Sequence, residues 1–307
     1  MSTSEFNGRF LEALSPTDPA AQSARAAILG VPYDGAVTYR SGASDGPEGL
    51  RRASESIETY CPKLERGLDE FTYVDLGDLR CELPAAGAIA GATPGERLVR
   101  SLRQQLDALP DLPLVAIGGD HLVAHPFLAR AVERHPALQI IHIDAHMDLR
   151  ADWDGEPFNH ATVLGRIREQ MGPEQRIHQW GIRSGERSEY ALARSDSRIE
   201  LLEPALAPML SRIRELLDRE LPIYLTIDID GLDPADMPGT GTPEPDGLRF
   251  GWVEAALDLL ATAPSTSPGL IGADIVELAP GLDPTGRSQV AAARLVRTLL
   301  LALVRPL

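Results

Sequence analysis

Short apolar runs recur along the chain and alternate with longer stretches of mixed polarity. The runs are rich in β-branched residues and are bounded by Gly, Pro or Asp. Such runs are typical of strands that are buried on both faces of a parallel sheet. We therefore predict strands at residues 26–30, 73–76, 114–117, 139–143, 177–180, 199–202, 223–227 and 270–275.

Several stretches between these runs carry apolar residues three and four positions apart, which is the spacing of a helix with one buried face. The first, residues 94–109, begins with Thr93 as its N-cap and Pro94 at its first position. The other predicted helices are residues 206–219, 252–261 and 288–304. Alternating strands and helices predict an α/β fold, with three α/β/α layers and a mostly parallel central sheet.

The same pattern indicates one main domain. Residues 1–24 show little periodicity and contain Pro16 and Pro19, so we expect an N-terminal arm or irregular cover. No linker rich in Pro, Gly or Ser divides the remainder. We therefore expect residues 25–307 to form a single domain.

Charge and composition narrow the classes of partner. The 307 residues carry a net charge of −16, which argues against nucleic acid and anionic membranes and favours cationic ligands. No apolar stretch is long enough for a membrane span, and the first residues lack the apolar core of a signal peptide. Cys61 and Cys81 fit neither a metal nor a redox motif. We expect a cytoplasmic protein with no nucleic-acid and no membrane partner.

Acidic and imidazole side chains follow four of the predicted strands. Ligands of open parallel sheets bind beyond the carboxyl ends of the strands, so these side chains are expected at one edge. They are His121 after residues 114–117, Asp144, His146 and Asp148 after 139–143, Asp228 and Asp230 after 223–227, and Glu277 after 270–275. An Asp-x-Asp alone is often a turn element, but four such segments together argue for a site.

Residue spacing adds to this interpretation, because positions i, i+2 and i+4 of an extended segment face one side. Four converging aspartates need a counter-charge, which two divalent cations would supply. Carboxylates with two imidazoles suit manganese best, and a bridging hydroxide would leave a net charge near −1 that suits a cationic substrate. We interpret four other histidines as packing or surface residues: His125, His135, His142 and His178.

Three motifs resemble those of the ureohydrolases, the family of arginases and agmatinases. They are Gly-Gly-Asp-His at 118–121, Asp-Ala-His-x-Asp at 144–148 and the segment 228–243, within a resemblance that spans residues 31–280. The resemblance implies an arginase-like fold, a ureohydrolase-like catalytic domain at 25–307, two Mn²⁺ per chain and a homotrimer or homohexamer. It assigns one metal to His121, Asp144, Asp148 and Asp228, and the other to Asp144, His146, Asp228 and Asp230.

The resemblance also implies a reaction, in which a metal-bridging hydroxide attacks a guanidinium carbon and urea is released. Glu277 matches the glutamate that holds the guanidinium, and His160 matches the histidine that transfers a proton. With Asp148, these are the expected catalytic residues. A carboxylate facing a planar cation makes a strong charge-assisted pair, and histidine titrates near neutral pH.

The substrate is the least defined part of this hypothesis. Residues 148–150, 160–164 and 181–184 look most like the agmatinase branch, which predicts conversion of agmatine to putrescine and urea. The loop 149–159 is mainly acidic and suits a free amine, with Asp152 and Arg150 as candidate substrate-binding residues beside Glu277, although the loop is equally explained as a solvated face. Arg150 or Arg183 holding a carboxylate would instead favour guanidinobutyrate or another guanidino acid.

Two further alternatives remain open. A single-metal zinc deacetylase of similar fold would use ligands like Asp144, His146 and Asp230, and a non-catalytic relative would have lost part of the site. Leu122, Met147 and Asp246 depart from the usual family residues without removing a metal ligand. These departures put the substrate in doubt more than the reaction.

Overall fold

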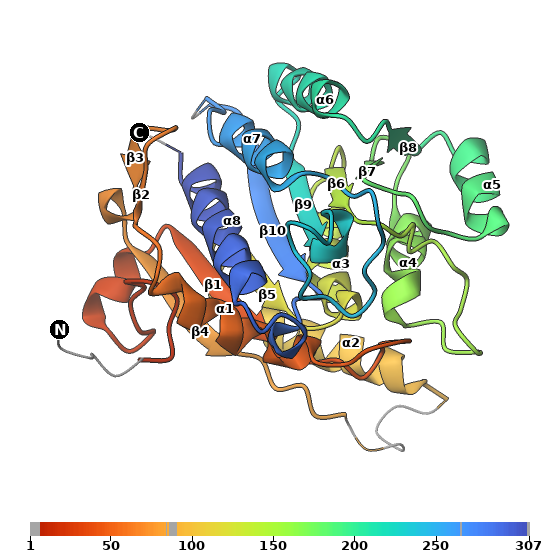
Figure 1. Cartoon of the computed structure of the whole chain (residues 1–307), viewed down its shortest axis with the longest axis horizontal. Helices are drawn as coiled ribbons and strands as arrows, with labels where there is room; N and C mark the ends of the chain where they lie inside the picture. Colours follow the sequence, from red (N-terminus) through yellow and green to blue (C-terminus); the bar gives the residue numbers. More distant parts are fainter. Residues whose placement is uncertain (1–6, 84, 86–90, 265, 306–307) are drawn as a thin grey trace.

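An eight-stranded sheet runs through the computed structural model, which describes residues 7–83, 85, 91–264 and 266–305 (Figure 1). All neighbouring strands in it are parallel, in the order β4-β1-β5-β10-β9-β6-β7-β8. In chain order they are β1 (Ala26–Val31), β4 (Tyr73–Asp78), β5 (Leu114–Gly118), β6 (Gln139–Ile143), β7 (Arg176–Trp180), β8 (Ile199–Leu202), β9 (Ile223–Asp228) and β10 (Leu270–Val276). The predicted fold class and strands are confirmed. A small antiparallel pair, β2 (Tyr60–Cys61) and β3 (Arg66–Gly67), was not predicted.

Helices cover both faces of the sheet. Four pack in one core: α1 (Gly46–Ser54), α6 (Leu206–Asp218), α7 (Phe250–Leu260) and α8 (Arg287–Leu303). Four pack in the other: α2 (Pro94–Asp107), α3 (His125–Arg134), α4 (Val163–Gln170) and α5 (Arg187–Ser195). Side chains alternate between the two cores, since Ile28 faces the first while Ala27 and Leu29 face the second. The sheet is therefore buried on both faces, as its continuous apolar runs require.

The four predicted helices begin and end within two residues of their predicted bounds. In α2 the Thr93 hydroxyl accepts from the backbone N–H of Glu96 and Pro94 stands in the first turn, which confirms the predicted N-cap. The long helix α8 is buried along most of its length and lies in front of the sheet in Figure 1. None of the helices in the described part of the chain is long and apolar enough to cross a membrane.

The part of the predicted arm that the structure describes, residues 7–24, packs on the edge strand β4. Phe10 is fully buried, and Leu14 forms a parallel bridge with Val74. The backbone N–H of Phe10 donates to Asp75, which also accepts from the buried Arg51 guanidinium. These residues therefore act as a cover on the domain; residues 1–6 lie outside the described residues.

The strand order decides where the predicted site residues meet. Strands β5, β10, β9 and β6 are direct neighbours in the middle of the sheet. They are the four strands that are followed by His121, Glu277, the Asp228 segment and the Asp144 segment. Because all four strands are parallel, their carboxyl ends bring these segments to one edge.

Candidate metal centre

A close backbone approach after β5 places His121. A Cβ on Gly119 would lie 1.7 Å from the carbonyl oxygen of Tyr33, so only glycine fits here. The next residue, Asp120, accepts from the backbone N–H groups of Ala36 and Leu122 through its two oxygens. These contacts fix the turn from which the His121 side chain enters the site.

Two site residues have backbone conformations that non-glycine residues rarely adopt. Asp148 has φ +53° and Glu277 has φ +63°, both in the left-handed region. Such conformations cost roughly 1–3 kcal/mol each and persist where the surrounding structure enforces them. Glu277 is held by its backbone N–H, which donates to the carbonyl oxygen of Gly119, so the two segments lock each other in place.

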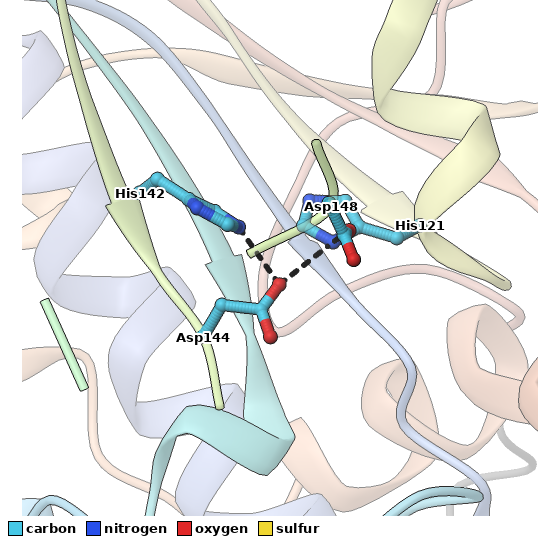
Figure 2. A group of neighbouring side chains, drawn as sticks. All are labelled: His121, His142, Asp144 and Asp148. Atoms are coloured by element: carbon cyan, nitrogen blue, oxygen red, sulfur yellow. Dashed lines mark hydrogen bonds and ion pairs between the residues drawn. The ribbon is translucent and has the colours of Figure 1, made fainter. Parts of the chain in front are cut away.

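His121 faces three carboxylates. Its Nδ1 atom lies 3.2 Å from Asp144, 3.0 Å from Asp148 and 3.4 Å from Asp228. Figure 2 shows the side chain of His121 close to those of Asp144 and Asp148, which come from the segment after β6. All four residues are buried.

A second group lies beside the first and shares Asp144 with it. His146 Nδ1 lies 3.0 Å from Asp230 Oδ2 and 3.6 Å from Asp144 Oδ1. Ligand atoms of Asp144, His146 and Asp230 lie within 4.8 Å of one another, as do those of a first group that contains His121, Asp144 and Asp148. The six predicted metal ligands thus gather in two adjoining groups.

The clustered carboxylates repel one another when no cation balances their charges. Burial, followed by the charges of Asp230 and Asp144, raises the pKa of Asp228 well above its ordinary value. Burial and Asp144 likewise raise the pKa of Asp230. Burial also opposes the ionised form of Asp144, but the neighbouring histidines, with His142 first, hold its pKa well below the ordinary value. A positive charge at this place would relieve the repulsion.

The hydrogen bonds of His121 test whether a metal fits. Its Nε2 atom lies 2.9 Å from the hydroxyl of Thr226, which donates its own proton to Asp274 over 2.5 Å. Thr226 must therefore accept from His121 Nε2–H, which leaves the lone pair of a neutral ring on Nδ1. Nδ1 is buried and forms no hydrogen bond within the described part of the chain. A lone pair aimed among three carboxylates is what a divalent cation needs.

A cavity of about 250 Å³ opens onto these groups. We call its inner wall the part lined by the buried Asp148, Asp228 and His160 together with His146, and its outer wall the part lined by the more exposed Arg150, Trp153 and Glu186. A larger cavity of about 470 Å³ lies at the opposite end of the strands, against Leu114 and Tyr224, away from the metal-ligand groups. The chemistry therefore belongs to the smaller cavity.

His160 and Glu277 lie in contact. His160 Nδ1 lies 3.1 Å from Glu277 Oε1, and its Nε2 lies 3.0 Å from the Thr38 hydroxyl. Burial alone would lower the pKa of His160, but the hydrogen bond to Glu277 and nearby carboxylates outweigh it and raise the pKa to about 9. Glu277 is buried behind His160 and also accepts from the backbone N–H of His121.

The three candidate residues for the substrate's far end occupy different positions. Arg150 lines the cavity, pairs with Glu186 over 2.7 Å and lies over the Trp153 ring. The Arg183 guanidinium hydrogen-bonds to the backbone. It donates to the carbonyl oxygens of Gly181, Asp230, Glu244 and Pro245. Asp152 is exposed and accepts from Gly155 N–H in its own turn, so its assignment to the substrate stays a prediction.

Sequence reasoning missed the polar role of His142. The pattern indicates a packing or surface residue, yet its Nε2 atom lies 2.7 Å from Asp144 Oδ2. The signal was present, because His142 precedes Asp144 by two positions and so faces the same side of the strand. The support of His121 by Thr226 and Asp274 was also missed, although both residues lie on strands that lead into the site.

Comparison with known proteins places the chain in one family. The model of the arginase family matches residues 24–302. The agmatinase of Bacillus cereus is 37% identical over 302 residues, which cover 97% of this chain and 100% of that protein. The N(1)-aminopropylagmatine ureohydrolase of Thermococcus kodakarensis is 32% identical over 84% of each chain. The structure of proclavaminate amidino hydrolase from Streptomyces clavuligerus matches with a TM-score of 0.79 and 28% identity over 96% of both chains. The chain therefore belongs to the arginase family, in its agmatinase branch, and is a ureohydrolase.

Proposed function

We propose that the protein hydrolyses agmatine to putrescine and urea at a centre of two manganese ions. The observation that carries this proposal is the pair of ligand groups sharing Asp144 at the inner wall of one cavity. The relatives named agmatinase support the choice of substrate. In the balanced reaction, water adds to the guanidinium carbon, the bond to the substrate's chain nitrogen breaks, and that nitrogen leaves as an amine.

The ligand set supports manganese. His121, Asp148 and Asp228 would hold one ion, His146 and Asp230 the other, and Asp144 would take part in both groups. The additional assignment of Asp228 to the second ion stays a prediction from the resemblance. An oxygen-rich set with two imidazoles suits manganese better than magnesium, which rarely takes imidazole, or structural zinc, which prefers sulfur. When bound, the two ions would supply Lewis acidity and lower the pKa of water toward neutrality.

His160 and Glu277 would position and protonate the substrate. His160 lines the cavity, and its raised pKa keeps the ring protonated at neutral pH, so it can give a proton to the leaving nitrogen. Glu277 holds His160 from behind and carries a negative charge that suits a guanidinium. For Glu277 to reach the substrate, the His160–Glu277 hydrogen bond must be exchanged for one to the guanidinium.

The far end of the cavity favours an amine over a carboxylate. Arg150 is already paired with Glu186, and Arg183 is held by backbone carbonyl groups. The two arginines that we considered as carboxylate ligands are thus engaged by the protein itself. Glu186 and the buried Glu189 lie on the same wall and both face Arg150, so two acidic groups stand against one arginine where the ammonium group of agmatine would lie.

The proposal is tested by urea release from manganese-loaded protein with agmatine, N(1)-aminopropylagmatine, guanidinobutyrate, arginine and formiminoglutamate. We expect agmatine to have the highest kcat/KM. Turnover of guanidinobutyrate without turnover of agmatine would overturn the choice of substrate. Binding of one zinc ion per chain in preference to two manganese ions would instead favour the deacetylase alternative.

A further inference from the structure

We propose that His142 is a positioning residue of the metal centre, whose Nε2–H donates to Asp144 and orients the carboxylate that both ligand groups share. The inference rests on the proposed metal site and adds a residue outside the six predicted ligands. Figure 2 shows the His142 ring directed at Asp144 from the end of β6, on the side opposite to His121. The contact is 2.7 Å, and both side chains are fully buried.

The strand pairing explains why a partner for the other ring nitrogen is present. His142 on β6 stands directly beside Gln179 on β7 in the parallel register. The side-chain amide of Gln179 lies 3.0 Å from His142 Nδ1 and 2.8 Å from the carbonyl oxygen of Met147. Gln179 therefore joins His142 to the segment that carries His146 and Asp148.

These contacts determine which ring nitrogen carries the proton. A carbonyl oxygen only accepts, so the group of Gln179 that faces Met147 is its NH₂ group. The same NH₂ group faces His142 Nδ1, which must accept the second amide proton. With Nδ1 accepting, the ring proton is on Nε2, where it is donated to Asp144.

The same assignment argues against His142 as a metal ligand. A ligand atom of His142 is close enough to those of His121, Asp144 and Asp148 for His142 to be considered a metal ligand. A ligand nitrogen needs a free lone pair, however, and the Gln179 contact leaves a proton on that nitrogen. His121 is the opposite case, since Thr226 accepts from its Nε2 and frees Nδ1 to face the carboxylates.

The consequence is a carboxylate fixed at both oxygens. Asp144 Oδ1 accepts from the backbone N–H of His146 over 2.6 Å, and Oδ2 accepts from His142. Oδ2 also lies 3.2 Å from His121 Nδ1, and Oδ1 lies 3.6 Å from His146 Nδ1. Each oxygen is thereby held toward one of the two ligand groups. Loss of the His142 donor would allow the carboxylate to rotate away from this shared position.

Two substitutions separate the donor to Asp144 from the acceptor for Gln179. In His142→Gln the terminal NH₂ group takes the place of Nε2 and still reaches Asp144. In His142→Asn the shorter amide takes the place of Nδ1, so it can satisfy Gln179 but cannot reach Asp144. His178→Asn on β7 is a matched control, because His178 is also buried and polar but contacts Glu200 and Gln139.

The readouts are manganese affinity, measured by competition with a chelating dye, and the EPR signal of exchange-coupled manganese pairs. We expect His142→Asn to weaken manganese binding about 10–100-fold and to reduce the coupled signal, as changes around metal ligands typically do. His142→Gln should lose less than about tenfold and keep the signal. His178→Asn should bind as the unaltered protein does.

The outcomes distinguish this inference from the proposed function. If the unaltered protein binds no manganese pair, the proposed metal site itself is wrong. If it binds two ions, and His142→Gln is as impaired as His142→Asn or more so, the donor role of His142 is wrong. Thermal unfolding of the metal-free variants, measured in parallel, shows whether a loss of binding comes from a loss of folding.

Discussion

At the scale of single residues, the site depends on which nitrogen of each histidine carries the proton. Thr226 sets this for His121, and Gln179 sets it for His142, so two rings of identical chemistry face the same carboxylate in opposite roles. The difference comes from the residue behind each ring. A substitution behind the ring therefore changes the site without touching a ligand.

His160 permits a direct test of proton transfer. Replacing His160 by Asn should lower kcat for agmatine about 10²–10⁴-fold, the usual contribution of a general acid or base, with a much smaller change in KM. Steady-state urea release measures both constants, and His178→Asn serves as a control for loss of a buried histidine. A kcat within a factor of two or so of the unaltered enzyme would remove His160 from the proton-transfer role.

The charge at the outer wall can be tested by comparing two acidic residues. Glu186→Gln should raise KM for agmatine about two- to fivefold, because exposed ion pairs contribute about 0.2–1 kcal/mol. It also frees Arg150 from its partner, so KM for guanidinobutyrate should fall. Asp152→Asn tests our sequence-based assignment of Asp152. If KM for agmatine rises only in Asp152→Asn, Asp152 and not Glu186 contributes to substrate binding.

At the scale of elements, Asp196 connects helix α4 to the segment before β8. It accepts from Arg168 and Arg198, and these bonds, with Arg198 first, hold its pKa below the ordinary value. Its stabilising contribution is present above the unfolded pKa near 4 and is lost as the pH falls through the lower folded-state pKa. Asp196→Asn should therefore lower the free energy of unfolding by about 1–2 kcal/mol at pH 7, and by less at pH 3.

Urea unfolding at the two pH values measures this difference. The matched control is Asp107→Asn, whose carboxylate pairs with Arg103 on the exposed face of α2. Substitution at such a surface position should change the free energy of unfolding by no more than about 0.5 kcal/mol. An equal effect of Asp196→Asn at pH 7 and pH 3 would contradict the ionic origin of its contribution.

The sequence pattern predicted the strands of the main sheet and the longer helices but not the short elements, for physical reasons. Inner strands such as β1 and β9 were found because both of their faces are buried, which leaves continuous apolar runs. The short helices α1, α3, α4 and α5 were not located individually, since two or three turns give too few residues to establish a period. The pair β2–β3, two residues long on each side, leaves no pattern at all.

The same limit explains what was found and missed in the site. The six ligands could be predicted because the i, i+2 spacing places them on one side of extended segments at neighbouring strand ends. The roles of Gln179 and Thr226 could not be predicted, because they depend on how strands are ordered in the sheet. Gln179 is 37 positions from His142 on the neighbouring strand, and Thr226 is 105 positions from His121, which follows a strand two places away in the sheet. Spacing along one chain carries no information about such pairs.

At the scale of the whole molecule, the aspartates proposed to bind metal are expected to destabilise the metal-free fold. Asp144, Asp148, Asp228 and Asp230 are buried together in a chain of net charge −16, and this repulsion lowers the stability of the metal-free protein. On the proposed function, manganese would bind this site only in the folded chain, so it should stabilise by about 2.7 kcal/mol per site at 100 times the dissociation constant, or roughly 5 °C in Tm.

Calorimetry with and without manganese tests this coupling, and Asp228→Asn sharpens the test. Removing one buried charge should raise Tm of the metal-free protein, because less repulsion remains, while the increase on adding manganese should shrink. A purely structural role of Asp228 would not give this result. Loss of a packing or hydrogen-bonding group would lower Tm both without and with manganese. Magnesium at the same concentration is the ionic-strength control. If Asp228→Asn lowers Tm without metal and leaves the manganese effect unchanged, Asp228 stabilises the fold and the two-ion arrangement must be assigned to other residues.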